Sequence, residues 1–281
     1  FGLYITVGAG VTNMVLDALL VGVIPLGVEG AAIATVLSQC VGGILPLVYF
    51  ARPNTSRLRL TRTRWELRPV LKSAANGSSE FMTNISMSIV TMLYNWQLLR
   101  LMGADGVTVF GIIMYVSFIF VALFLGYSMG SAPIVSFHYG AGNQEELKGL
   151  FRRSLTIILA MSAGLTVLAI VLAKPLAMIF VSYDPALLSV TTRALTIYAV
   201  SYLLTGFNIY ASSFFTALND GLVSALISFA RTLVFQVLAV LTLPLLWEAD
   251  GIWAAVILAE GLAAILSLAC FLRFRRKYGY A

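Results

Sequence analysis

Apolar runs of about 20 residues or more, divided by short polar stretches, account for most of the chain. A helix of that length crosses the hydrocarbon core of a bilayer, so the pattern predicts transmembrane α-helices. Turn-forming and helix-ending residues mark where the runs stop. The predicted spans are residues 3–26, 30–50, 78–102, 107–136, 153–173, 187–216, 222–246 and 251–272. The predicted fold class is an all-α polytopic membrane protein with eight transmembrane helices.

Composition supports a bilayer, rather than water, as the environment of the chain. Hydrophobic residues make up 60% of the 281 residues and charged residues 11%, which is too little polar surface to cover a soluble domain. The net charge of +6 would suggest nucleic acid in a soluble protein, but the basic residues here lie between apolar runs. The sequence therefore predicts the lipid bilayer, and no nucleic acid, as a partner.

Lys and Arg are distributed unevenly over the loops, and this distribution predicts the orientation of the chain. Three segments, 52–72, 148–153 and 273–277, carry 14 of the 18 Lys and Arg residues. Because short basic loops stay in the cytoplasm, these segments are expected on that side of a plasma (inner) membrane. Both ends of the chain are then predicted to be cytoplasmic.

Two segments with similar patterns indicate an internal repeat. "GVEGAAIATVLSQ" (27–39) and "EADGIWAAVILAE" (248–260) each close a turn on glycine and open a helix with small residues. If they correspond, the repeating unit has six helices, so spans three to eight form one unit and the first two spans end another. Four more helices are then expected before Phe1, in a protein of about twelve spans with parallel repeats.

Polar residues inside the spans are the candidate functional groups, and the first is Asp17. It lies near the middle of the first span, with Asn13 one turn earlier on the same face. An unpaired charge at this depth costs at least ~2.5 kcal/mol, so Asp17 is expected to be neutral, paired or in contact with cavity water. It either bonds to a neighbouring helix as a structural group or binds a cation or proton in a transport path.

The third span carries a polar stripe, whose members recur every three or four residues and therefore share one helix face. They are Asn76, Glu80, Asn84, Ser88, Thr91 and Asn95. The stripe either makes a hydrogen-bonded seam with another helix or lines a water-filled cavity. The ionisable Glu80 favours the cavity, because a seam needs no acid and burying one is unfavourable.

Later spans add two charges and an aromatic group. Glu260 lies close to mid-membrane, opposite Gln39 in the repeat comparison. Arg231 on the preceding span is within reach of Glu260 if the two helices form an antiparallel hairpin, and such an ion pair would be structural. Span six adds Tyr198, Tyr202 and Thr205 at helical spacing. Aromatic faces beside a carboxylate suit a lipophilic cation.

Motifs for catalysis or nucleotide binding are absent from the sequence. It has no GxxxxGK[ST] loop for ATP and no GxSxG elbow, and its only histidine, His138, excludes an HExxH zinc site. We therefore expect neither enzymatic activity nor a cofactor. Transport by this chain would have to use an ion gradient or run downhill.

Three segments, "NMVLDALLVGVIPLGVEGAAIATVLSQ" (13–39), "NGSSEFMTNISMSIVTMLYN" (76–95) and "YSMGSAPIVSFHYGAGN" (127–143), carry a family resemblance. Together they resemble the multidrug and toxic compound extrusion (MATE) family, at helices five and six, seven, and the end of eight. The resemblance covers nearly all of the chain and implies two six-helix lobes around a central cavity. Residues 1–50 would then end the N-terminal lobe, 51–77 form a basic cytoplasmic linker, 78–272 the C-terminal lobe, and 273–281 a basic tail.

The resemblance also implies roles for particular residues. Asp17 matches an acidic position on the fifth helix of some members. Glu80 lies on the seventh helix, where some Na⁺-coupled members have a cation-binding Glu, although its spacing from Gly77 departs from the family pattern. Cation or proton coupling is therefore expected at Asp17, Asn13, Glu80 and Glu260, with any Na⁺ near Asp17 or Glu80.

The predicted function is secondary active transport by a monomer, in which Na⁺ or H⁺ enters while organic cations, drugs or other xenobiotics leave. The residues expected to line the cavity are Gln39, Asn84, Ser88, Thr91, Asn95, Tyr198, Tyr202 and Thr205. One alternative is a flippase for lipids or lipid-linked oligosaccharides in the same superfamily, which would favour a strongly cationic cavity. A membrane-embedded enzyme or a scaffold is a further alternative, but the sequence shows neither a nucleophile with a base nor a large loop domain.

Overall fold

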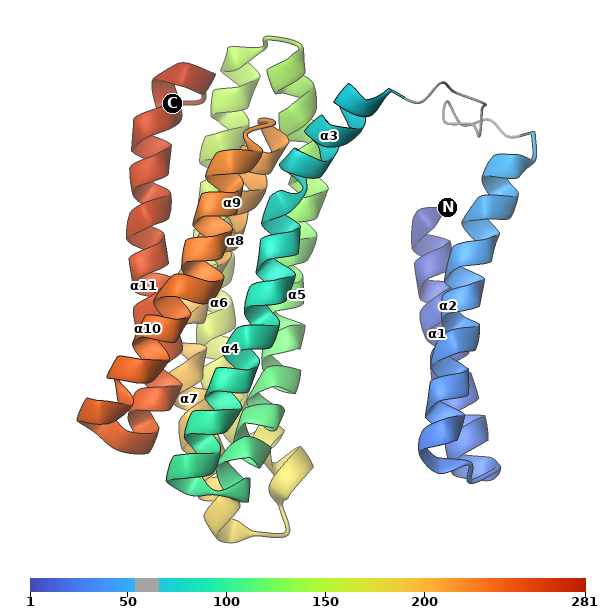
Figure 1. The fold of residues 1–281 in the computed structure, drawn as a ribbon, viewed down its shortest axis with the longest axis vertical. Helices are drawn as coiled ribbons and strands as arrows, with labels where there is room; N and C mark the ends of the chain where they lie inside the picture. Colours follow the sequence, from blue (N-terminus) through green and yellow to red (C-terminus); the bar gives the residue numbers. More distant parts are fainter. Residues whose placement is uncertain (54–65) are drawn as a thin grey trace. The chain divides into compact units, whose positions relative to one another are not determined.

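The computed structural model describes residues 1–53 and 66–281, except for the side chains of Ala75, Asn76, Ser78, Ser79, Glu80 and Met82. The described residues form two compact units, Phe1–Glu66 and Leu67–Ala281, here called the first and second unit (Figure 1). Both are helical, and the described residues contain no strand. Helices satisfy every backbone N–H and C=O within one segment, which hydrocarbon surroundings require. Much of the predicted linker, residues 54–65, lies outside the described residues.

The first unit is a helical hairpin. Helix α1 (Gly2–Asp17) continues into the π-helix η1 (Ala18–Val23) and packs against α2 (Gly27–Ala51). The turn depends on glycine at two positions. Gly27 has a φ of 58°, in the left-handed region. At Gly30 an added Cβ would lie 2.8 Å from the backbone oxygen of Leu20, so the two helices approach each other through a position without a side chain.

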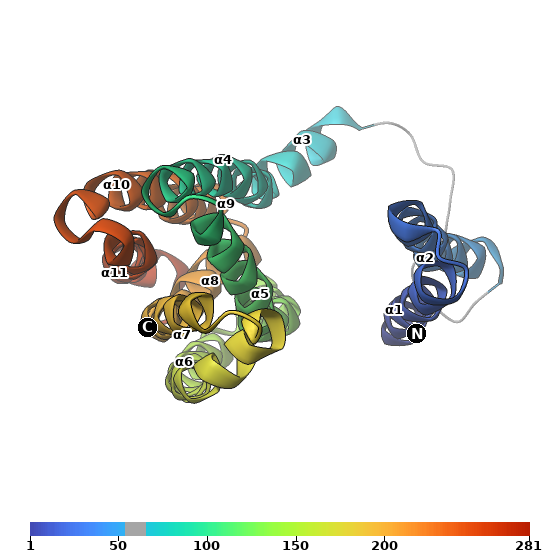
Figure 2. The same cartoon turned by 90° about the horizontal axis from the view of Figure 1, so that it is seen from below.

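The second unit is a bundle of helices that differ widely in length. They are α3 (Leu67–Asn76), α4 (Ser78–Met102), α5 (Ala104–Gly140), α6 (Gln144–Val181), α7 (Pro185–Ala199), α8 (Tyr202–Ala217), α9 (Gly221–Phe229), the π-helix η2 (Ala230–Val234), α10 (Phe235–Thr242) and α11 (Pro244–Tyr278). Helix α8 packs against α5, α6, α9 and α11 (Figure 2). Polar residues on α8 are therefore placed inside the unit.

The hairpin between α10 and α11 resembles the one in the first unit. At Gly251 an added Cβ would lie 2.4 Å from the backbone oxygen of Leu243, so here too only glycine fits. Gly30 and Gly251 are the glycines that the two similar sequence segments place in correspondence. This shared close approach supports the internal repeat.

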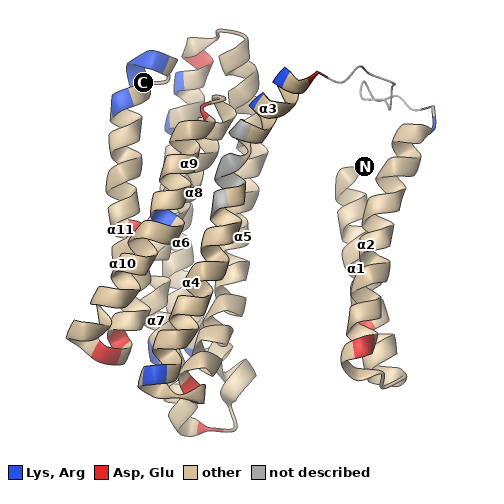
Figure 3. Cartoon of the chain, viewed as in Figure 1, with Lys and Arg blue, Asp and Glu red and all other residues tan. Residues whose placement is uncertain are grey.

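Charged residues in the second unit gather at the ends of its helices (Figure 3). Three acidic or amide side chains there cap helices: Asn143 accepts the N–H of Glu146, Asp184 those of Ala186 and Leu187, and Asp220 that of Val223. Such caps satisfy backbone donors that a helix start leaves free. The interior of the bundle has a hydrophobic core and also contains buried serines and threonines, Gln97, Asn208 and Glu260.

Two observed features differ from a set of eight straight spans. The predicted span 187–216 is divided between α7 and α8, which are bent by 47°. At this break the N–H of Ser201 bonds to the oxygen of Tyr198, which is a tighter turn than an α-helix makes. The predicted span 222–246 contains η2.

Fewer than eight helices of the described residues pass as spans by length and hydropathy. Six helices of the described residues are long and apolar enough to cross a membrane, or seven if α7 and α8 form one broken span. Helix α4 is 25 residues long but is not among them, and its asparagine, serine and glutamine side chains lower its hydropathy. The membrane-protein fold class is confirmed, whereas the count of eight stays a prediction.

Candidate functional site

A buried ion pair forms the polar centre of the second unit. Glu260 on α11 is 3% exposed and is the one charged residue in the described chain that is more than nine-tenths buried. The Nε of Arg231 lies 2.9 Å and 3.0 Å from its two carboxylate oxygens, and Nη2 lies 2.9 Å from Oε1. The two residues that a hairpin would bring together are therefore in contact.

Arg231 reaches Glu260 from the π-helix η2. A π-helix bonds N–H(i) to O(i−5), and such segments often mark functional sites in membrane and soluble helices alike. Here the N–H of Phe235 bonds to the oxygen of Ala230, so the loop of backbone around Arg231 is wider than one α-helical turn. The side chain of Arg231 stays 17% exposed, in contrast to that of Glu260.

Asn208 on α8 completes the surroundings of the carboxylate. Its amide nitrogen donates to Glu260 Oε2 at 2.7 Å and to the backbone oxygen of Glu260 at 2.9 Å. Its own oxygen accepts a hydrogen bond from Ser267 at 3.0 Å. Asn208 and Ser267 are both fully buried. Glu260 therefore has hydrogen bonds from two directions, α8 and η2, and neither oxygen is left without a donor.

The aromatic residues of the broken span lie next to this centre. Tyr202 is buried and shares a hydrogen bond of 2.8 Å with Ser117 on α5. Tyr198 stacks edge-on against Tyr202, with ring centroids 6.0 Å apart. Thr205 is also buried, but it bonds to the backbone oxygen of Ser201 within its own helix. These residues are packed and bonded inside the unit, so only half-buried Tyr198 has surface to offer a ligand.

The polar stripe of α4 faces away from the interior of the second unit. Asn84, Ser88 and Thr91 are exposed and Asn95 is half-buried, whereas the opposite face of α4 is buried through Tyr94. No seam within the unit covers Ser88 or Thr91 among the described residues. The side chains of the other two members of the stripe, Asn76 and Glu80, lie outside the described residues.

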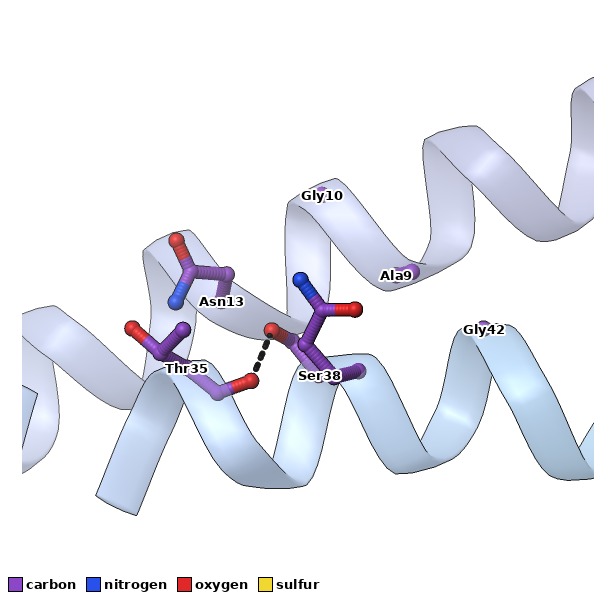
Figure 4. Close-up of a pocket in the computed structure, with 7 residues that line it drawn as sticks. Ala9, Gly10, Asn13, Thr35, Ser38 and Gly42 are labelled. Carbon is purple, nitrogen blue, oxygen red and sulfur yellow. Dashed lines mark hydrogen bonds between the residues drawn. The ribbon is translucent and has the colours of Figure 1, made fainter. Parts of the chain in front are cut away.

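The first unit contains an open groove of about 270 Å³ between α1 and α2. Its lining is Ala9, Gly10, Asn13, Thr35, Ser38, Gln39 and Gly42. The predicted candidates Asn13 and Gln39 both contribute, and Figure 4 shows Asn13 beside Thr35 across the two helices. Small residues on both helices leave the space, since a Cβ added at Gly10 would have no neighbour within 4 Å.

Asp17 lies one turn beyond Asn13, at the end of α1. Its Oδ1 is buried and has no hydrogen-bond partner among the described residues. Buried polar atoms are nearly always bonded, and of the six buried side-chain atoms without a partner among the described residues, Asp17 Oδ1 is the one that belongs to an acid. The described residues contain no cluster of three or more His, Cys, Asp or Glu that would hold a transition metal.

Sequence reasoning missed several residues of these sites, among them Asn208, Thr35 and Ser38. Asn208 follows Thr205 by three residues on the same helix, so the spacing that selected the tyrosines also pointed to it. Thr35 and Ser38 lie among small residues in the sequence, and Ser38 donates its hydroxyl to the backbone oxygen of Thr35. Their contribution depends on packing between α1 and α2, which no single-helix pattern reveals.

A polytopic helical fold with a polar centre inside one unit and an open polar groove in the other is that of a multi-pass membrane protein. The MatE family model matches residues 81–241, which is more than half of the chain. The chain therefore belongs to the MatE family, and the family resemblance seen in its sequence is confirmed.

Named relatives agree with this assignment. The chain is 22% identical over 258 residues to the multidrug export protein MepA of Staphylococcus haemolyticus, covering 91% of this chain and 56% of that protein. It is 27% identical over 168 residues to the probable multidrug resistance protein NorM of Thermotoga maritima, covering 59% and 35%. The chain thus spans little more than half the length of MepA.

Solved structures share the fold. A crystal structure of a MATE in complex with MaL6 has a TM-score of 0.86 at 23% identity, over 99% of this chain and 62% of that one. A MOP superfamily transporter from Pyrococcus furiosus has a TM-score of 0.85 at 23% identity, over 96% and 60%. At this level of identity the likeness establishes the fold.

Proposed function

We propose that this chain is part of a secondary active exporter of organic cations and other drugs, driven by inward movement of Na⁺ or H⁺ through Asp17. Membership of the MatE family and the names of the relatives support multidrug export. The observation that carries the coupling role is the buried, unpartnered oxygen of Asp17. An intramembrane acid without a partner is expected to be protonated, to bind a cation or to contact cavity water, and the first two of these are the proposed coupling role.

The surroundings of Asp17 support a small cation or a proton as that species. Asn13 and Thr35 offer neutral oxygens on the groove a turn away. Carbonyl, hydroxyl and carboxylate oxygens are the ligands that hard cations prefer. Occupancy of Asp17 would then favour one conformation of the transporter over the other and so couple ion entry to drug exit. The role of Glu80 as a second ion-binding acid rests on the sequence.

Orientation and substrate class are part of the proposal. The basic ends of α6 and α11 and the start of α3 lie at one end of the second unit, and this end is proposed to be cytoplasmic (Figure 3). The stripe of α4 and half-buried Tyr198 are proposed to contact substrate, and the complete protein to act as a monomer. No observation favours a lipid-linked sugar flippase, because the buried base Arg231 is neutralised by Glu260.

The test is efflux of ethidium from cells that express the complete protein, with Na⁺ and pH gradients imposed separately. Export should follow one of the gradients, which identifies the coupling ion. Asp17→Asn should abolish that dependence, while Glu29→Gln, an exposed acid near the start of α2, serves as the matched control. Export by Asp17→Asn with unchanged ion dependence would remove the coupling role. No export under either gradient would argue against drug export itself.

A further inference from the structure

The carboxylate of Glu260 would be a cation site if Arg231 were absent. It is 3% exposed, and Asn208 donates one hydrogen bond to its Oε2 and another to the backbone oxygen of Glu260, neither of which involves Arg231. Ser267 in turn fixes the orientation of Asn208. The carboxylate is therefore positioned by α8 and α11 independently of its basic partner. A buried acid held in this way requires a positive charge or a proton beside it.

We propose that Arg231 permanently occupies the cation-binding position beside Glu260. There it keeps both Na⁺ and H⁺ from Glu260 and so determines which acids of the protein couple transport to ions. The inference rests on the proposed function, since it concerns which acids couple transport to ions. A guanidinium is not deprotonated in proteins and its flat fork matches a carboxylate. Because it is covalently attached, it competes at a high effective concentration with any free ion. Arg231 thereby restricts coupling to acids outside this centre.

The other groups around Glu260 cannot take over the role of Arg231. Tyr94 on α4 and Tyr198 on α7 are titratable side chains that lie close enough to interact with it electrostatically. Tyr94 donates its hydroxyl to Gln236 at 3.0 Å, and Gln236 is neutral. No second Asp, Glu, Lys or Arg in the described chain has a contact with the pair. Removing the charge of Arg231 therefore leaves the acid to an ion from solution.

The experiment compares four forms of the complete, purified protein: wild type, Arg231→Gln, Arg231→Lys and the double variant Arg231→Gln/Glu260→Gln. The melting temperature is measured while NaCl replaces choline chloride at constant pH, and then while pH is lowered without Na⁺. An ion that binds only the folded state raises the melting temperature. These two arms distinguish Na⁺ from H⁺.

Arg231→Gln is expected to gain a saturating rise of melting temperature with Na⁺, or with falling pH, that the double variant lacks. Arg231→Lys keeps the charge and should respond as the wild type does. If folded Arg231→Gln responds no differently from the double variant, the proposal is overturned. The readout needs no transport, so a failure of the proposed drug export would appear separately, as absent efflux by the wild type.

A second measurement applies if Arg231→Gln does not fold. The double variant removes both charges at once, which is often tolerated by a buried pair. Its export should keep the ion dependence of the wild type, because Glu260 is not used for coupling while Arg231 occupies it. Loss of the ion dependence in a folded double variant would show that Glu260 already couples in the wild type and would overturn the proposal.

Discussion

The two units of this protein each contain an acid within an apolar helix, but they treat it differently. In the second unit, Glu260 receives hydrogen bonds from Arg231 and Asn208 on both of its oxygens. In the first unit, Oδ1 of Asp17 is buried without a partner among the described residues. The comparison shows that an acid in a membrane helix is not by itself a functional signal. What distinguishes the two is whether the neighbouring helices supply donors.

The strongest way to break this comparison is to unpair the bonded acid. Glu260→Gln leaves the Arg231 guanidinium inside the second unit without a counter-charge, and should destabilise the complete protein by about 3–5 kcal/mol. Melting temperature and the yield of folded protein in detergent measure the effect. Adding Arg231→Gln to this variant should restore most of the loss. A single variant as stable as the wild type would mean that the pair contributes nothing to the fold.

The space around one glycine in each unit gives a second and smaller contrast. At Gly206 on α8 an added Cβ would lie 2.6 Å from the ring of Phe124 and 2.6 Å from Ser162 Oγ. Gly206→Ala should therefore cost about 1–3 kcal/mol through overpacking. Gly43→Ala on α2 is the matched control, because no atom lies within 4 Å of its added Cβ. The control should leave the melting temperature unchanged or raise it slightly. Equal effects at both positions would refute the contrast.

A third acid, Asp220 at the start of α9, lies outside the apolar helices and is expected to make stability depend on pH. Burial raises the pKa of Asp220, but hydrogen bonds from Tyr278, the Val223 N–H and Lys277 outweigh burial and hold the pKa below the ordinary value of 3.8. A carboxyl with a lowered pKa contributes stability above the unfolded value and loses it as pH falls through the folded value.

The melting temperature of the wild type should accordingly fall on acidification below about pH 4, and Asp220→Asn should reduce that fall. Asn retains the ability to cap α9, so the comparison isolates the charge. The measurement is a pH series of melting curves for both proteins. Parallel curves would show that Asp220 does not contribute to the acid sensitivity.

The smallest expected effect concerns the stability of the unpartnered acid. Because Oδ1 of Asp17 has no donor to lose, Asp17→Asn should change the free energy of unfolding by less than about 0.5 kcal/mol. The same variant is expected to lose ion-dependent export, so function and stability should separate at this residue. A loss of stability comparable to that of Glu260→Gln would identify Asp17 as a structural group instead.

Much of the architecture could be predicted from the sequence, because apolar run length follows directly from bilayer thickness. The break between α7 and α8 could not, since Val200 and Ser201 include neither proline nor glycine and the bend depends on tertiary packing. For the same reason the periodicity of α4 predicted one polar face but not what that face contacts. Asn84, Ser88 and Thr91 of that stripe are exposed on the second unit, whereas Tyr94 and Gln97 on the other face make the contacts with α10.

The candidate residues also differ in whether their contacts could be predicted from the sequence. Arg231 and Glu260 were accessible to a hairpin argument, because two adjacent antiparallel helices place few residues opposite one another. Asn208 comes from a helix more distant in sequence, and its contact with Glu260 depends on α8 lying inside the bundle. Thr35 became a candidate only when the groove between α1 and α2 was seen.

The π-helices have a consequence for how relatives of this chain are aligned. Each unit contains one in the first helix of its last hairpin, at Ala18–Val23 and at Ala230–Val234. A π-helix accommodates a single inserted residue without leaving the helix. Insertions and deletions in this family are therefore expected inside apolar helices as well as in loops. A one-residue deletion within Ala230–Val234 is expected to close this wide turn into an α-helical one, which would change the position of Arg231 relative to Glu260.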